Sequence, residues 1–312
     1  MARRQIGQER LKLGADQGRQ TGSLDEISTL IDWVEIDRHL AVIYAAAKGE
    51  QAWPPLSLFK ALLLAVWYDL SDVKLAEALE DRASFRRFCG FASDEPTPER
   101  TAFVRFRREL VARSLDRALF EAVTNQLDRR GVIVKTGALV DATLIASASI
   151  KIDEEARWAG HRRKKPVHGD KAHVATDETA GLVRSVEITT ANIHDGPMLE
   201  AVLPHDPGDV YGDSAYSAGR FTDVIRARGG TARVVYTHTW GGPEALERLE
   251  EWNASVRAVR CRIEKVFGTW KRSYGLRRMR WLGLAKAGLQ VRLTAMAYNL
   301  RRTMVLVRAQ AA

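Results

Sequence analysis

The sequence predicts a helical domain over residues 24–131, followed by an α/β domain over residues 132–312 in which helices flank a mixed sheet of five strands. In the first region, apolar residues recur at steps of three and four, the period of an amphipathic helix. From about Gly131 onward, β-branched and apolar runs of strand length begin. Three consecutive strand candidates are then followed by alternating helices and strands, which is typical of one α/β domain. Residues 1–23 lack apolar periodicity, and we expect a flexible basic arm there.

Apolar spacing and stop signals predict the helices of the first domain. Five apolar residues from Leu24 to Val34 mark the first helix, and Phe59–Trp67 marks a largely buried one. Ser71 is suited to cap the next helix, and a short segment after it ends at the stop residue Gly90. The pair Thr97-Pro98 is expected to begin a further helix, which continues to about Leu110.

This further helix is rich in arginine. Its basic residues are Arg100, Arg105, Arg107 and Arg108, beside several apolar side chains. A helix, a turn and an arginine-rich helix are compatible with DNA binding, so we expect Arg105 and Arg108 to contact DNA. Many helical domains that bind no DNA share this pattern, and that alternative stays open.

The elements of the second domain follow from apolar and alternating runs. Strand candidates are Val132–Ile150, His168–Thr176, Leu182–Thr189, Asp209–Asp213 and Ala232–Tyr236. Helix candidates are a segment after Pro197, the segment Phe221–Arg228 and a long basic segment, Ala254–Ser273.

The overall charge points to a polyanionic partner, because the formal net charge is +9. Cys89 and Cys261 have no metal-ligand spacing, and we expect reduced thiols in a cytoplasmic protein. The basic N-terminus has no apolar segment like that of a signal peptide. The longest apolar run, Ala61–Trp67, is too short to span a bilayer, so no membrane partner is expected. An RNA-binding protein would need an aromatic platform that we do not find.

Two carboxylates stand in unusual places. Asp141 lies inside the otherwise apolar strand Ala138–Ile145, where a buried carboxylate must be paired, lie at an edge or bind a metal. Asp213 stands where a short strand gives way to a turn, and open α/β sheets place ligands at the carboxyl ends of strands. Taken alone, each has an ordinary alternative: an outward-facing strand residue for Asp141 and a turn former for Asp213.

Glu264 is the third carboxylate, and it is the only acid between Arg257 and Arg280. On a continuous helix, steps of seven return to nearly the same face, so Arg257, Glu264 and Lys271 would line up. Arg260 would lie one turn from Glu264. The alternative is a solvated basic helix with an ordinary Arg–Glu pair.

Together the three carboxylates suit Mg²⁺ or Mn²⁺, which prefer oxygen ligands. Two such ions, about 4 Å apart, can activate the attacking oxygen and stabilise the leaving one in phosphodiester chemistry. Arg257, Arg260 and Lys271 would hold DNA phosphates against the carboxylates. The pattern therefore predicts a two-metal enzyme that acts on DNA.

Five segments in order carry a family resemblance: Val140–Thr143, Gly169–His173, Asn192–Asp195, Tyr211–Tyr216 and Arg260–Lys271. Over roughly residues 138–275 the chain resembles the DDE transposases of bacterial insertion sequences, particularly the group named after insertion sequence five. The helical first region also looks like the N-terminal region of this group. Related families end in a Tyr, Arg, Glu, Lys signature, which Arg260, Glu264 and Lys271 fit in spacing, whereas Arg257 replaces the Tyr.

The resemblance implies a ribonuclease H-like core with Asp141, Asp213 and Glu264 as the catalytic, metal-binding triad. It implies two phosphoryl transfers at one site: water cuts at a transposon end, and the freed 3′ hydroxyl then attacks target DNA. It also implies a homodimer that holds double-stranded DNA with the inverted repeats of both ends. Two alternatives remain, a two-metal nuclease that does not join DNA and a domesticated DNA-binding protein without catalysis.

Residues near these motifs have secondary assignments. Lys171 and His173 share one face of a strand and are expected to contact DNA or support the site. Asn192 and His194 are expected to support it as well. Asp195 precedes a helix start and is interpreted as a helix cap rather than a metal ligand.

Three further features have structural interpretations. The run Arg162–Lys165 is expected to be a solvated loop that contacts the phosphate backbone only loosely. Trp240 lies in a loop, where local packing is more common than stacking on an unpaired base. Trp270 is expected in the core.

Overall fold

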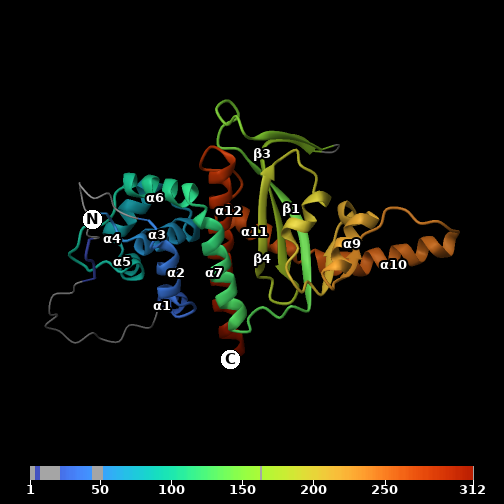
Figure 1. The fold of residues 1–312 in the computed structure, drawn as a ribbon, viewed down its shortest axis with the longest axis horizontal. Coiled ribbons are helices and arrows are strands. Elements are labelled where there is room, and N and C mark those ends of the chain that lie inside the picture. Colours follow the sequence, from blue (N-terminus) through green and yellow to red (C-terminus); the bar gives the residue numbers. More distant parts are fainter. Residues whose placement is uncertain (1–3, 8–21, 44–51, 162–163, 312) are drawn as a thin grey trace.

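The computed structural model describes residues 4–7, 22–43, 52–161 and 164–311. The long helix α12 (Leu284–Ala311) stands between the helical region on one side and the sheet on the other (Figure 1). The basic arm expected over residues 1–23 and the pair Arg162–Arg163 lie mostly or wholly outside the described residues. Lys165 belongs to a strand rather than to the expected loop.

Within the described residues, the helical region consists of α1 (Ser23–Ser28), α2 (Trp33–Leu40), α3 (Pro55–Trp67), α4 (Asp72–Asp81), α5 (Ala83–Cys89), α6 (Arg100–Ala112) and α7 (Leu115–Arg129). Two predicted end signals are confirmed. The Ser71 hydroxyl accepts a hydrogen bond from the Lys74 amide at 3.3 Å and caps α4. Gly90, with φ of 87°, ends α5 in the left-handed conformation that glycine adopts readily.

Two predicted helix starts differ from the structure. The single helix predicted over Leu24–Val34 is split, because the Asp32 side chain accepts a hydrogen bond from the Val34 amide at 2.9 Å and starts α2. The helix expected from Thr97 begins at Arg100 instead. The Thr97 hydroxyl is buried without a hydrogen-bond partner and does not cap it.

The described residues form one mixed sheet of six strands: β1 (Gly137–Ala146), β2 (Arg157–His161), β3 (Lys164–Asp177), β4 (Val183–Thr190), β5 (Asp209–Gly212) and β6 (Thr231–Val234). β3 pairs antiparallel with β1, β2 and β4, whereas β5 pairs in parallel with β1 and β6. This mixed sheet with flanking helices is the ribonuclease H-like fold that the resemblance implies. The predicted count of five strands is wrong by one, because the first part of the long β3 also pairs with the unpredicted β2.

Helices cover both faces of this sheet. Val140 and Val210 pack on one face against α8 (Leu199–Val202) and α9 (Gly219–Ala227). Leu139 and Val174 pack on the other face in a core that includes α11 (Ile263–Ser273) and α12. Because side chains alternate along a strand, the residue after Val140 points away from the face that α8 and α9 cover.

The sequence patterns did not predict α12. Its residues Ala287–Leu300 are buried on all sides, so no amphipathic stripe marks it. It packs against α3, α6 and α7 and also against β3 and β4, which joins both regions in one core. None of the described helices, α12 included, is both long and apolar enough to cross a membrane.

The long helix predicted over Ala254–Ser273 is interrupted. α10 (Pro243–Arg260) ends at Arg260, and α11 begins at Ile263. The Glu264 amide donates to the Cys261 carbonyl at 3.1 Å and the Arg262 amide donates to Val259 at 3.1 Å, which are tighter three-residue steps. Arg257 and Glu264 therefore lie on two successive helices rather than on one.

Candidate active site

Asp141 and Asp213 lie level with each other on neighbouring strands. β1 and β5 are parallel, with Leu139 opposite Tyr211. Continued for two residues along each chain, this register brings Asp141 level with Asp213, which directly follows β5. Adjacent strands are about 4.8 Å apart, and level residues point to the same face. The fold thus brings together two carboxylates that lie far apart in the sequence.

Burial raises the pKa of both carboxyl groups. The pKa of Asp141 is raised to about 6, because burial and the negative charges of Asp213 and Asp195 outweigh the Arg260 guanidinium and the Ala142 amide. The pKa of Asp213 is also raised, chiefly by burial. Two carboxylates that are this poorly hydrated and that repel each other favour a cation nearby.

Arg260 supplies one positive charge. Its Nη1 lies 2.7 Å from Asp141 Oδ2, and both side chains are mostly buried. The other oxygen, Asp141 Oδ1, accepts a hydrogen bond from the Ala142 amide at 2.8 Å. The sequence analysis predicted that Arg260 lies one helical turn from Glu264, but it did not predict the ion pair of Arg260 with Asp141. The last turn of α10 thereby points a guanidinium at the carboxylate pair.

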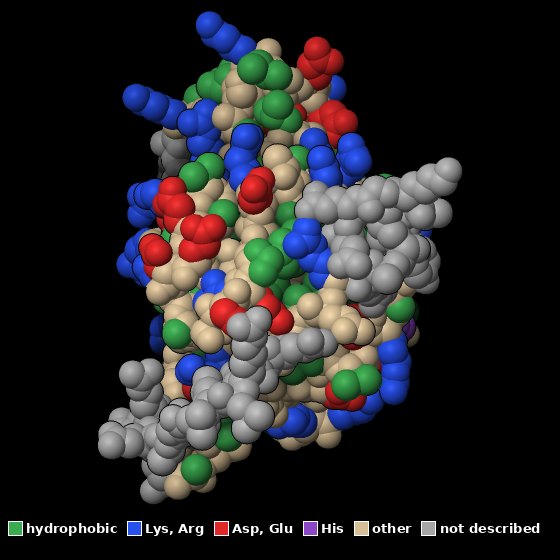
Figure 2. All heavy atoms as spheres, turned by 90° about the vertical axis from the view of Figure 1, so that its left-hand side faces the viewer, with side chains coloured by type: hydrophobic (Ala, Val, Ile, Leu, Met, Phe, Trp, Pro, Cys, Tyr) green, Lys and Arg blue, Asp and Glu red, His purple; other side chains and the backbone are tan. Residues whose placement is uncertain are grey.

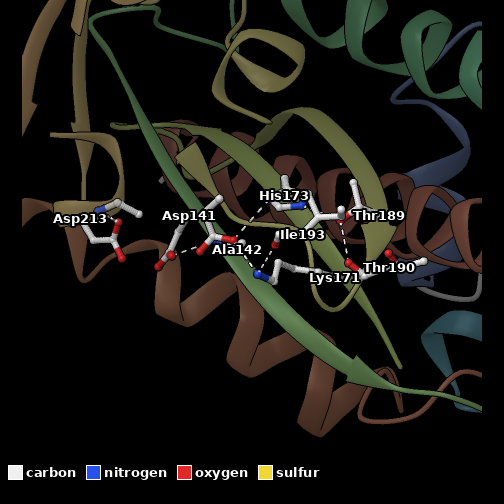
Figure 3. Close-up of polar contacts among 10 residues, drawn as sticks. Asp141, Ala142, Lys171, His173, Thr189, Thr190, Ile193 and Asp213 are labelled. Carbon is white, nitrogen blue, oxygen red and sulfur yellow. Dashed lines mark hydrogen bonds and ion pairs between the residues drawn. The ribbon is translucent and has the colours of Figure 1, made fainter. Parts of the chain in front are cut away.

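Asp195, which follows β4, has a charged partner on β3. Lys171 Nζ donates to Asp195 Oδ1 at 2.9 Å and to the Ile193 carbonyl at 2.6 Å. Figure 3 shows Asp141 between Asp213 and the Lys171–His173 pair. The interpretation of Asp195 as a helix cap is wrong, because its side chain makes no capping hydrogen bond. The spacing of residues around Asp195 did not predict its ion pair with Lys171. The shared strand face of Lys171 and His173 did indicate that these two side chains lie near the site.

Lys171 and His173 have positions suited to support. His173 is 0% exposed, and its Nε2 lies 2.9 Å from Thr189 Oγ1. Burial lowers the pKa of His173 to about 4, so its ring is neutral at pH 7. Of the two roles expected for this pair, support of the site fits these contacts better than a DNA contact does. The neighbours Asn192 and His194 are exposed on the turn after β4.

Glu264 lies in the first turn of α11, with an exposed side chain. Arg257 is exposed on α10, and Lys271 is partly buried near the end of α11. Glu264 and Lys271 lie seven residues apart within α11, as predicted for one helix face, whereas the interruption at Cys261 and Arg262 separates Arg257 from them. Among the described residues, no three His, Cys, Asp or Glu side chains lie close enough together to hold a metal ion. The structure thus joins Asp141 with Asp213 but leaves Glu264 outside their cluster.

The arginine-rich helix α6 has both buried and exposed guanidinium groups. Arg105 and Arg108 are exposed, whereas Arg107 is buried and lies 2.6 Å from Asp72. Figure 2 views the molecule from the side of the helical region, and Lys and Arg side chains are interspersed there with Asp and Glu. The two exposed arginines remain available to a partner, but this face is not a uniformly basic stripe.

Trp270, Trp240 and the two cysteines differ in burial. Trp270 is fully buried in the core, as predicted. Trp240 is 100% exposed, so the interpretation that it packs locally is wrong. Cys89 and Cys261 are free cysteines, the first buried and the second exposed.

Comparisons with known proteins agree with the resemblance. A family model described as a transposase DDE domain matches residues 133–300, which is more than half of the chain, and one described as a transposase domain matches residues 13–109. Among solved structures, the chain is similar to a cryo-EM structure of the piggyBac transposase synaptic complex with hairpin DNA. That alignment covers 92% of this chain and 75% of the other, at 8% sequence identity and a TM-score of 0.46.

Proposed function

Because the chain belongs to the family of DDE transposases, we propose that Asp141, Asp213 and Glu264 hold the divalent ions with which it cuts and joins DNA. The observation that carries this proposal is the parallel register of β1 and β5, which places Asp141 and Asp213 each two residues beyond the paired Leu139 and Tyr211. Glu264 is assigned the third position from its spacing to Arg260 and Lys271, which fits the signature of related families.

The residues present fit such an ion. DDE transposases use divalent metal ions, and Mg²⁺ and Mn²⁺ prefer carboxylate oxygens. The Asp141 and Asp213 carboxylates are mutually repulsive and mostly buried, so a cation would relieve both penalties. A bound ion would stabilise the charge that develops on the phosphate and lower the pKa of the attacking water. We propose two ions, because both the attacking and the leaving oxygen need neutralisation.

Basic side chains would position the DNA. Arg260 is already ion-paired with Asp141 and would contact a phosphate that is bound at the carboxylates. We assign Arg257 and Lys271 to further phosphate contacts, since they flank Glu264 on α10 and α11. In the helical region, residues 24–131, we assign DNA binding or dimerisation and expect Arg105 and Arg108 to contribute.

We propose the following reaction. Water attacks a phosphodiester at the transposon end, the bond to the 3′ oxygen breaks, and a 3′ hydroxyl is freed. This hydroxyl then attacks a phosphodiester of target DNA and displaces a second 3′ oxygen, so one bond forms for each bond broken. Handling two ends together implies a homodimer on double-stranded DNA, in the bacterial cytoplasm where the nucleoid lies.

A strand-transfer assay tests this proposal. Labelled duplexes that carry the element's inverted repeats are incubated with protein, Mg²⁺ and an unlabelled target plasmid. The proposal predicts label covalently joined to the plasmid. Cleavage without joining would instead support a two-metal nuclease. Binding without cleavage or joining in either Mg²⁺ or Mn²⁺ would support a DNA-binding protein without catalysis.

A further inference from the structure

Asp213 is held by the turn that follows it. Its side chain accepts a hydrogen bond from the Ala215 amide at 2.9 Å and caps the short 3₁₀ turn Ser214–Tyr216. The Tyr216 amide donates to the Asp213 carbonyl at 3.2 Å. A carboxylate that caps a turn of its own chain keeps this hydrogen bond only while the turn keeps its place. The direction of the Asp213 carboxylate therefore depends on the position of Ser214–Tyr216.

Tyr216 anchors this turn on the other face of the sheet. Its side chain is 1% exposed and packs in the same core as Val140. Because Val140 precedes Asp141 on β1, this core lies on the face opposite to the Asp141 side chain. Gly212 permits this path, since a Cβ built there would lie 2.8 Å from Tyr216 Cδ2. The chain thus passes within three residues from Asp213, at the candidate site, to a buried anchor.

Gly196 packs against the same turn from the segment that follows β4. A Cβ built on Gly196 would lie 2.7 Å from the Ala215 carbonyl oxygen and 2.6 Å from Phe221 Cζ. Cβ atoms almost never approach other atoms within 3.0 Å, so any side chain at this position would force a shift. Ala215 also donates the hydrogen bond that orients Asp213, and its amide and carbonyl groups share one Cα. A displaced Ala215 carbonyl would therefore move the amide that orients the carboxylate.

We propose that Gly196 is a positioning residue for Asp213. Because it has no side chain, the segment after β4 closes onto the Ala215 carbonyl. This contact keeps Ser214–Tyr216 in the place from which the Asp213 carboxylate is oriented. The metal role of Asp213 in this inference rests on the proposed function. Gly196 acts through the turn and needs no contact with metal or DNA.

Gly196→Ala tests this inference in the full chain without DNA. Hydrogen–deuterium exchange reports on the Ala215 amide, and free Mn²⁺ measured by electron paramagnetic resonance reports on metal affinity. We expect Ala215 to exchange about tenfold faster and Mn²⁺ affinity to fall about tenfold, the lower end for a residue that supports a metal ligand. Wild-type exchange at Ala215 in this variant would overturn the inference.

Gly230→Ala is the matched control. A Cβ built on Gly230 would lie 2.8 Å from Pro207 Cγ and 2.9 Å from the Gly208 carbonyl oxygen, beside the start of β5 and at the opposite end of that strand from Asp213. This variant introduces a similar overlap away from the turn, and it should leave Ala215 exchange and Mn²⁺ affinity unchanged. Equal changes in both variants would mean a general loss of stability and would overturn the inference.

Gly196→Ala combined with Phe221→Leu separates the two contacts of the new methyl group. The smaller leucine relieves the overlap with the ring but leaves the overlap with Ala215. Mn²⁺ affinity should therefore stay about tenfold below that of Phe221→Leu alone. An affinity equal to that of Phe221→Leu alone would mean that ring packing causes the loss, and it would overturn the inference. This pair of variants also provides the test if Gly196→Ala alone does not fold.

Asp213→Asn shows which claim has failed. If it weakens Mn²⁺ binding while Gly196→Ala does not, the inference falls and the proposed function stands. If neither variant weakens Mn²⁺ binding, the metal assignment of Asp213 in the proposed function falls. Exchange at the Ala215 amide then still decides whether Gly196 holds the turn.

Discussion

Arg260 Nη1 lies 2.7 Å from Asp141 Oδ2, and this ion pair connects the last turn of α10 to the central strand of the sheet. The same guanidinium lowers the pKa of Asp213, so a single side chain acts on both members of the carboxylate pair. Arg260 thus does in part what a metal ion would do, because it compensates repulsion between poorly hydrated anions. Its removal should change the protonation of the site.

Arg260→Gln should shift the pH dependence of DNA cleavage. Because Arg260 lowers the pKa of both Asp141 and Asp213, its loss raises both values, and the two carboxylates then ionise at higher pH. The acid limb of the cleavage rate against pH should therefore move to higher pH. Arg257→Gln serves as the control, since Arg257 is exposed on the same helix. An equal shift in both variants would mean that the loss of any positive charge on α10, and not the loss of the Arg260–Asp141 ion pair, moves the acid limb.

Asp170→Asn should stabilise the protein at pH 7. Burial, with the charges of Asp153 and Glu155, raises the pKa of Asp170 from 3.8 to about 6. The folded state therefore binds more protons than the unfolded state between these values, and stability falls as pH rises through that window. Removing the charge should raise the free energy of unfolding at pH 7 by about 1–3 kcal/mol, and by little at pH 4. Urea unfolding at both pH values measures this, and a variant less stable at pH 7 would contradict it.

Arg292→Met should destabilise the joint between α12 and α7. Arg292 Nη1 lies 2.6 Å from Asp116 Oδ2, and both side chains are almost fully buried. Breaking a buried pair leaves an uncompensated charge, so we expect a loss of about 3–5 kcal/mol in urea unfolding. The double variant with Asp116→Leu should recover part of that loss. If the single variant is as stable as the wild type, the pair does not hold the joint.

Glu264→Gln should abolish cleavage without affecting the fold. The Glu264 side chain is exposed in the first turn of α11, so the melting temperature of the variant should stay close to that of the wild type. The cleavage rate should fall by more than the roughly 10- to 100-fold typical of an outer-shell partner of a metal. Glu247→Gln, exposed on α10, is the control and should cleave normally. Normal cleavage by Glu264→Gln would remove it from the triad.

The sequence predicted local features well and pairings poorly. Local sequence patterns predicted three features: the cap at Ser71, the helix end at Gly90 and the strand that contains Asp141. Each of them depends on residues that are close together in the sequence. Asp195 has a lysine partner on another strand, and no spacing within its own segment encodes that contact. The break after Arg260 was also missed, since its residues remain compatible with a continuous helix.

The most direct test of the central claim compares the wild-type protein with Asp141→Asn on labelled DNA that carries the element's ends, with and without Mg²⁺. Cleavage products are quantified together with DNA binding in the same samples. We predict cleavage that requires Mg²⁺ and disappears in Asp141→Asn, while binding and melting temperature are retained. Cleavage by Asp141→Asn at the wild-type rate, or cleavage without any divalent ion, would contradict the assignment of the Asp141–Asp213 pair as the metal-binding catalytic centre.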